Sequence, residues 1–148
     1  MTENERLIRK LYEVAEVQDA AGFAALFADD GYFWDVPAGA KYVGKDIEKP
    51  IGQYATAFPD MHRELGKFYE TADTIIVELS LNGTHEGPLV LAAGTIQPTH
   101  QKIQVPCCDV FVIKDGKVQS FHCYNAASVL LAQIGVLGNL GAALTPNA

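Results

Sequence analysis

The chain is short of positive charge and of cysteine. Only 11 of its 148 residues are Lys or Arg, against 18 Asp or Glu, and the formal net charge is −7. The basic residues are scattered and form no stripe that would bind a phosphate backbone, which argues against a nucleic-acid partner. Three cysteines, an odd number, do not make a disulfide framework and instead favour a reducing compartment.

Long hydrophobic runs are also missing. Residues 1–6 are polar and lead into an amphipathic pattern, so they have the features of neither a signal peptide nor a membrane span. We therefore expect a cytoplasmic protein with no membrane partner. Hydrophobic residues still make up 49% of the chain, enough for one core. The sequence predicts a single domain over residues 1–148, with a loosely held tail from about residue 138.

The hydrophobic periodicity changes near residue 63. Before this point, apolar residues recur at helical spacing and predict helices over about residues 3–18 and 45–57, with a short helix capped by Asp19 and a turn at residues 29–31. After it, apolar and polar residues alternate and predict strands, which include residues 103–113 and 117–125. Helices followed by a mainly antiparallel sheet indicate an α+β fold.

The register of the last two strands selects a candidate site. Asp115 and Gly116 predict a two-residue hairpin turn, which places Asp109 opposite His122. Opposed side chains have Cβ atoms about 4.5 to 5.5 Å apart, so these two residues are candidates for a hydrogen-bonded pair facing a pocket. The alternative is that they only satisfy each other at the surface of the sheet. The same register predicts an apolar outer face made of Cys108, Val110, Val112, Phe121 and Cys123, with the two thiols as neighbours.

Several motifs resemble the SnoaL-like polyketide cyclase family. They are the segments FPDMH (58–62), NGTHEG (82–87), DVF (109–111), DGKV (115–118) and LLAQIG (130–135). The resemblance covers roughly residues 5–137. It implies a cone-shaped α+β barrel of the nuclear transport factor 2 and ketosteroid isomerase type, in which a curved, mainly antiparallel sheet and N-terminal helices enclose one apolar pocket. Its members include isomerases, cyclases, hydrolases and inactive proteins, so the chemistry must be argued from the residues.

The resemblance also suggests roles for single residues. Asp35 occupies the place of the general base of ketosteroid isomerases, and Asp109 that of their oxyanion-hole aspartic acid. The tyrosine of that oxyanion hole corresponds to about position 11, next to Tyr12. The usual acid/base aspartate of the cyclases corresponds to Ala126, beside Asn125. Because alanine cannot move a proton, either Asp109 and His122 have taken over the chemistry or the cyclisation has been lost.

The sequence thus predicts Asp109, His122 and Asp35 as candidate catalytic residues, with a turn-capping role as the alternative for Asp35. The candidate substrate-binding residues are aromatic or polar side chains expected at the pocket or its rim: Trp34, Phe111, Tyr124, Tyr12, His62 and Asn125. No spacing of histidines and carboxylates indicates a metal, and no glycine-rich phosphate loop is present, so we expect neither metal nor cofactor. Hydrolase relatives require an arginine in the sheet between two aspartates. Arg63 is the only arginine after residue 9, so the sequence disfavours hydrolysis of an epoxide.

Two functions are consistent with these residues. The favoured one is general acid/base cyclisation or isomerisation of an apolar carbonyl compound. The alternative is a non-catalytic binding or assembly module that kept the pocket and lost the family aspartate. In both cases the apolar outer face of the sheet predicts a homodimer, because a contiguous patch of this kind usually marks an interface.

Overall fold

The computed structural model describes residues 1–138 as a mixed α+β structure. The tail expected from about residue 138 lies outside this range, apart from residue 138 itself. Each described helix is too short or too polar to cross a lipid bilayer. The elements follow in the order α1 (Glu3–Glu16), α2 (Ala20–Ala24), β1 (Phe27–Asp35), β2 (Ala40–Val43), the 3-10 helix η1 (Gly44–Ile47), α3 (Glu48–Ala57), β3 (His62–Glu70), β4 (Thr74–Thr84), β5 (Leu89–Leu91), β6 (Gly94–Ile96), β7 (Lys102–Lys114), β8 (Lys117–Asn125) and α4 (Ala127–Gln133).

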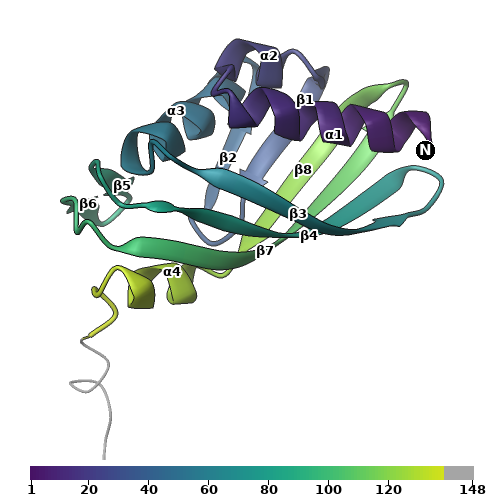
Figure 1. Cartoon of the computed structure of the whole chain (residues 1–148). Helices are drawn as coiled ribbons and strands as arrows, with labels where there is room; N and C mark the ends of the chain where they lie inside the picture. The colour runs from purple at the N-terminus through teal and green to yellow at the C-terminus, as the bar shows by residue number, and fades with distance from the viewer. Residues whose placement is uncertain (139–148) are drawn as a thin grey trace, which may run out of the picture.

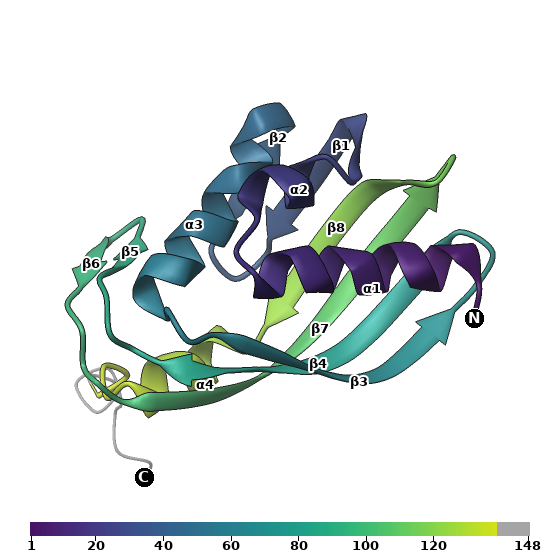
Figure 2. The ribbon, with the colours of Figure 1, turned by 45° about the horizontal axis from the view of Figure 1, so that its top comes forward.

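Six strands form one curved sheet in the order β2-β1-β8-β7-β4-β3, and β5 pairs with β6 in a separate two-stranded sheet. In the large sheet β1 runs parallel to β8, and the other neighbours are antiparallel. Helices α1, α2 and α3 lie across one face of this sheet, whereas α4 packs beside β7 on the other side (Figures 1 and 2). This is the curved, mainly antiparallel sheet with N-terminal helices that the sequence predicted.

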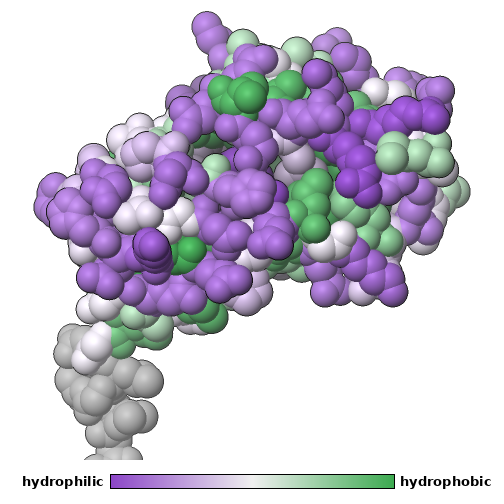
Figure 3. All heavy atoms as spheres, viewed as in Figure 1, coloured by the Kyte–Doolittle hydropathy of each residue, from purple (hydrophilic) through white to green (hydrophobic). Residues whose placement is uncertain are grey.

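The core fills the space between these helices and the covered face of the sheet. The ring centroids of Phe111 and Phe121 lie 4.3 Å apart, and those of Phe33 and Phe121 lie 4.4 Å apart. Phe23 of α2 joins them from the helical side. Outside this core, the face drawn in Figure 3 is mostly hydrophilic, with hydrophobic atoms in smaller patches. Aromatic packing therefore joins β1, β7 and β8 to the helices that cover them.

Helices α1 and α3 both direct an apolar stripe at the sheet. The hydroxyl of Thr2 accepts a hydrogen bond from the Glu5 backbone N–H at 3.1 Å and caps α1. The buried residues of α1 then recur at helical spacing as Ile8, Leu11, Tyr12, Val14 and Ala15. The corresponding residues of η1 and α3 are Ile47, Pro50 and Ile51, followed by the partly buried Tyr54. These two stripes bring a tyrosine from each helix toward the strands.

The hairpin between β7 and β8 begins as predicted. Asp115 and Gly116 form its turn with φ angles of 51° and 74°. Positive φ at both positions is what a two-residue turn of type I′ requires. Lys114 pairs with Lys117 on either side, which confirms the turn.

One residue beyond this start, the register changes. Ile113 lies opposite Val118, but Val112 lies opposite Ser120. Gln119 is therefore an extra residue in β8, which makes a β-bulge. Because strand side chains alternate between faces, one extra residue moves every later side chain of β8 to the opposite face from the one expected.

The bulge is matched by an irregular stretch of β1. Residues 29–31, which the sequence placed in a turn, lie inside β1, where its pairing with β8 is interrupted. Gln119 Nε2 donates a hydrogen bond to Asp30 Oδ1 at 3.2 Å, so the two irregular stretches contact each other. A Cβ atom on Gly31 would lie 2.7 Å from the carbonyl oxygen of Val118, too close for any other residue.

The prediction of which side chains lie on each face of the sheet is therefore correct for β7 and wrong for β8 after Gln119. Asp109 faces the interior as predicted, but it lies opposite Cys123 and not opposite His122. Phe121 and Cys123 are buried on the interior face, where His122 and Tyr124 were expected. His122 and Tyr124 belong to the outer face.

Gly87 offers a test of how α3 is held. Its N–H donates to the carbonyl of Ala57 at 3.2 Å, and an added Cβ would overlap the carbonyl oxygen of Thr56. We expect Gly87→Ala to lower the free energy of unfolding by about 1–3 kcal/mol. Gly52→Ala, within α3 itself, is the control. Nothing lies within 4 Å of its added Cβ, and alanine stabilises a helix by about 1 kcal/mol relative to glycine. Urea unfolding that shows equal effects of both substitutions would contradict this account.

Candidate active site

A cavity of about 50 Å³ lies between α1, α3 and the covered face of the sheet. This is far below the volume of about 300–1,000 Å³ of a pocket that holds a drug-sized ligand. Most of its lining is apolar, and the polar side chains come from several elements: Tyr12, Tyr54, Arg63, Asp109 and Asn125, with the thiols of Cys107 and Cys123. A few convergent polar groups in an apolar cavity are typical of a small-molecule site. An organic ligand requires the lining side chains to move apart.

Asp109 is the central polar residue of this cavity. It projects from β7 and is 3% exposed. Its Oδ2 accepts a hydrogen bond from the Tyr12 hydroxyl at 2.7 Å, and its Oδ1 accepts one from the Cys107 thiol at 3.2 Å. Burial raises the pKa of Asp109 to about 6, although these donors and the charge of Arg63 act in the opposite direction. The carboxyl group therefore titrates close to neutral pH.

Tyr12 reaches the cavity from α1. Burial, followed by the negative charge of Asp109, raises the pKa of Tyr12 well above its usual value, so the phenol stays protonated and donates. Phe111 is fully buried and meets Tyr12 edge to face, with ring centroids 6.0 Å apart. Phe111 thus lies in the interior as expected, but it supports Tyr12 and is not itself part of the cavity lining.

Asp35 forms a second buried carboxyl site at the end of β1. It is 4% exposed and accepts a hydrogen bond from the Tyr54 hydroxyl at 2.7 Å. Asn125 Nδ2 donates to its other oxygen at 3.4 Å. Burial and the charge of Asp35 raise the pKa of Tyr54 well above its usual value. Tyr54 and Asn125 both line the cavity, so Asp35 orients two of the groups that a ligand would meet.

His122 lies on the outer face of the sheet, away from Asp109. Its Nε2 is 2.7 Å from the hydroxyl of Tyr32, and its ring meets that of Trp34 edge to face at 5.1 Å. Burial and the nearby positive charge of Lys41 lower the pKa of His122. Tyr124 packs beside it and is 44% exposed. The predicted pair of Asp109 and His122 is therefore wrong, and the bulge in β8 is the physical reason.

Two expected substrate contacts are also misplaced. Trp34 packs with His122 and Lys41 on the outer face, not in the cavity. His62 is exposed at the start of β3, where its Nδ1 lies 3.0 Å from Glu16 Oε2. This contact with Glu16 at the surface accounts for the histidine without a ligand.

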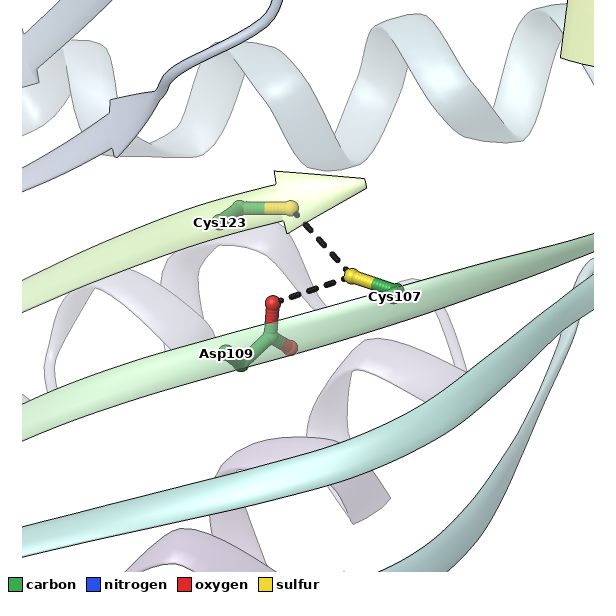
Figure 4. A group of neighbouring side chains, drawn as sticks. All are labelled: Cys107, Asp109 and Cys123. Atoms are coloured by element: carbon green, nitrogen blue, oxygen red, sulfur yellow. Dashed lines mark hydrogen bonds between the residues drawn. The ribbon is translucent and has the colours of Figure 1, made fainter. Parts of the chain in front are cut away.

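The sequence reasoning missed Tyr54 and the pairing of Cys107 with Cys123. Tyr54 follows Ile51 on the apolar stripe of α3, so helical periodicity contained the signal that places it at the cavity. The two thiols lie 3.7 Å apart on the interior face, and their meeting depends on the bulge (Figure 4). Cys108, which was expected beside Cys123, is on the outer face.

Arg63 and Ala126 bear on the family comparison. Arg63 lies in the sheet, on β3, and lines the cavity, but its salt-bridge partner is Glu16, with Nη1 and Oε1 3.8 Å apart. Ala126 stands at the N-cap of α4, directly after Asn125. The carboxyl groups found at this site are those of Asp109, in the cavity lining, and Asp35, behind Tyr54 and Asn125.

Comparison with solved structures shows the same fold over almost the whole chain. A protein with a ketosteroid isomerase-like fold from Catenulispora acidiphila DSM 44928, solved with trimethylamine, has 20% identity and a TM-score of 0.75, covering 95% of this chain and 97% of that one. AclR from Streptomyces galilaeus, a proposed hydroxylase, has 21% identity and a TM-score of 0.77, covering 96% and 98%. A proposed SnoaL-like polyketide cyclase from Jannaschia sp. CCS1 has 14% identity and a TM-score of 0.76, covering 89% and 91%.

Identities this low show the fold and leave the chemistry open, as the different activities proposed for these proteins illustrate. The comparison with curated proteins finds no match. The sequence model of the SnoaL-like domain matches residues 8–121, which include most of α1, most of the cavity lining and most of the sheet. A match over this much of the sequence shows that the chain belongs to the SnoaL-like domain family.

Proposed function

We propose that this protein is a cofactor-free acid/base enzyme of the cyclase or isomerase type, acting on an apolar carbonyl compound. The observation that carries the proposal is geometric: two buried carboxyl groups, Asp109 and Asp35, each accept a tyrosine hydroxyl at 2.7 Å beside one apolar cavity. Removing a proton from carbon while charge gathers on oxygen requires an acid/base group and a hydrogen-bond donor in a water-poor site. The cavity contains both.

Asp109 is the residue that we assign to proton transfer. It lines the cavity directly, whereas Asp35 acts through Tyr54 and Asn125. In the proposed step, the carboxylate of Asp109 takes a proton from the carbon next to a carbonyl, and the electron pair moves to the carbonyl oxygen. The resulting enolate either regains the proton at another carbon or attacks a second carbonyl of the same molecule. A pKa raised to about 6 suits a group that both takes and returns a proton near neutral pH.

Asp35 is assigned a positioning role. Its hydrogen bonds fix the hydroxyl of Tyr54 and the amide of Asn125 beside the cavity. Because Tyr54 donates its one hydrogen to Asp35, the amide of Asn125 and the guanidinium of Arg63 are the donors that would orient a carbonyl oxygen. The site has two carboxyl groups, but the proposed reaction moves one proton. Assigning proton transfer to Asp109 and positioning to Asp35 accounts for both groups. The expectation of a cytoplasmic location stays a prediction.

Exchange of carbon-bound hydrogen tests the proposed activity without knowledge of the natural substrate. A panel of apolar monocyclic and bicyclic ketones in D₂O is followed by NMR, which reports both binding and deuterium uptake next to the carbonyl. We expect catalysed uptake in the native protein and a loss of about 10²- to 10⁴-fold in Asp109→Asn. His122→Gln is the matched control, because it removes a titratable side chain from the outer face, and it should leave the rate unchanged.

The outcomes separate the two candidate functions. Ketones that bind without uptake above the buffer rate would favour the non-catalytic binding module. Equal losses in Asp109→Asn and His122→Gln would contradict the assignment of Asp109 and of the cavity as the reaction site.

The pH dependence of stability tests the environment of Asp109 without a ligand. A carboxyl group with a pKa of about 3.9 in the unfolded chain and about 6 in the folded one favours folding most below pH 4, and this contribution is lost as pH rises through 6. Relative to Asp109→Asn, the native protein should lose about 2 kcal/mol of unfolding free energy between pH 4 and pH 7. Urea unfolding at each pH measures this difference. A difference that stays constant or grows with pH would contradict the buried, proton-retaining carboxyl.

We also propose that the outer face of the sheet forms a homodimer interface. The bulge changes its composition: His122 and Tyr124 join Val110, Tyr32 and Trp34 there, in place of Phe121 and Cys123. Exposed aromatic side chains on a sheet face support association with a second copy.

Sedimentation at micromolar concentration tests this interface. The native chain is expected to sediment as a dimer, and Tyr124→Glu should raise the dissociation constant at least about tenfold because it places a charge in an apolar contact. Val17→Glu is the control, since Val17 is an exposed apolar residue at the end of α1. A native chain that sediments as a monomer would overturn the proposal.

A further inference from the structure

Three buried side chains with metal-binding atoms meet at one end of the cavity. The Sγ atoms of Cys107 and Cys123 and a carboxylate oxygen of Asp109 all lie within 4.8 Å of one another (Figure 4). The two sulfurs are 3.7 Å apart, and Cys107 Sγ is 3.2 Å from Asp109 Oδ1. Cys107 and Asp109 project from β7 and Cys123 from the neighbouring strand β8.

A disulfide does not suit this arrangement. Asp109 lies opposite Cys123 and Cys107 lies opposite Asn125, so the two cysteines are diagonal neighbours across the strands. Diagonal residues are about 7–8 Å apart, with Cβ atoms somewhat closer, whereas a disulfide needs Cβ atoms about 3.5–4.5 Å apart. Direct bonding of the two sulfurs would therefore require the strands to move. An atom placed between them would not.

The spacing fits a tetrahedral metal site. Zinc binds thiolate sulfur at about 2.3 Å and carboxylate oxygen at about 2.0–2.2 Å, so ligands at tetrahedral angles lie about 3.8 Å apart for two sulfurs and about 3.5–3.7 Å apart for sulfur and oxygen. The separations of 3.7 Å and 3.2 Å agree with these edges to within about 0.5 Å. All three ligand atoms lie within 4.8 Å of one another.

We propose that Cys107, Cys123 and Asp109 bind one Zn²⁺ ion or a similar thiophilic divalent cation, with the fourth coordination position facing the cavity. Two thiolates select soft and borderline cations over Mg²⁺ and Ca²⁺. Three protein ligands with one open position are the arrangement of zinc sites that bind water or a small molecule.

The side chains around the three proposed ligands also support metal binding. The Tyr12 hydroxyl holds Asp109 Oδ2 at 2.7 Å and leaves Oδ1 directed toward the thiols. Asn125 Nδ2 donates to Cys123 Sγ at 3.6 Å. Hydrogen bonds to ligand atoms of this kind orient them in known metal sites. Arg63 lines the same cavity, and its positive charge offsets the single negative charge left by two thiolates, one carboxylate and a divalent cation.

Binding must release protons. Each thiol gives up its proton to solvent as the sulfur bonds to the metal, and Asp109 binds as a carboxylate. Metal affinity should therefore rise with pH. The metal and the proposed acid/base reaction compete for Asp109, so an occupied site should lack proton-transfer activity. The test of the metal site does not depend on that activity, because metal binding is measured directly.

Titration of chelator-treated protein with Zn²⁺ tests the site, with calorimetry for stoichiometry and Co²⁺ for the absorption bands of thiolate ligation. We expect one ion per chain with thiolate bands, and an affinity at least about 100-fold lower in Cys107→Ser and in Cys123→Ser. Tyr12→Phe, which removes the hydrogen bond to the ligating carboxylate, should weaken binding about 10- to 100-fold. Cys108→Ser is the matched control, because this thiol neighbours Cys107 in sequence but lies on the outer face, and it should leave affinity unchanged.

Thermal unfolding gives a second measurement that does not depend on calorimetry. Zn²⁺ should raise the melting temperature of the native protein and of Cys108→Ser, because a ligand that binds only the folded state stabilises it. It should not raise that of Cys107→Ser or Cys123→Ser. Absence of binding to the native protein, or binding that survives in both of these variants and so belongs to exposed histidines, would overturn the proposal.

Discussion

The hydrogen bond between Tyr12 and Asp109 is the interaction on which the arrangement of this protein depends. A carboxyl group buried this deeply is strongly unfavourable without donors, and the 2.7 Å hydrogen bond from a helix to the centre of the sheet supplies one. It constrains the rotation and position of α1 over β7, since a rotated α1 would leave the carboxyl group without this partner. Phe111, packed under the Tyr12 ring, adds an apolar contact between the same two elements. The second pair, Tyr54 with Asp35, fixes α3 over β1 in the same way.

This constraint also explains how far the sequence could predict the molecule. The helical periodicity of α1 and the turn at Asp115 and Gly116 are local signals, and both act in the structure as expected. The inward direction of Asp109 followed from the same local reasoning, because β7 is regular from Asp109 to Val112. What failed was the assumption that β8 is regular as well.

The bulge at Gln119 could not be predicted from the hairpin alone. It depends on a third strand: residues 29–31 of β1 are irregular at the same level, and Asp30 accepts a hydrogen bond from Gln119. Only the assembled sheet brings these residues together. The consequence was large because an alternation of period two converts one extra residue into an exchange of faces. His122 moved out of the site, Cys123 moved into it, and a supposed carboxyl and imidazole pair became a carboxyl beside two thiols.

Membership in a family does not determine which of these groups carries out the chemistry. Where family members place an aspartate, this chain has Ala126, and the nearest polar lining residue, Asn125, can orient a ligand but cannot accept a proton from carbon. A proton and a metal ion would both bind at Asp109, whose two oxygens face different partners: Oδ2 faces a phenol that always donates, and Oδ1 faces a thiol that donates only while it is protonated. The hydrogen bond with Cys123, followed by burial, raises the pKa of the Cys107 thiol well above its usual value, so this thiol stays a donor to Oδ1 until a cation displaces its proton. In the proposed metal site a cation must displace the protons of both thiols, whereas the proposed proton transfer leaves both in place.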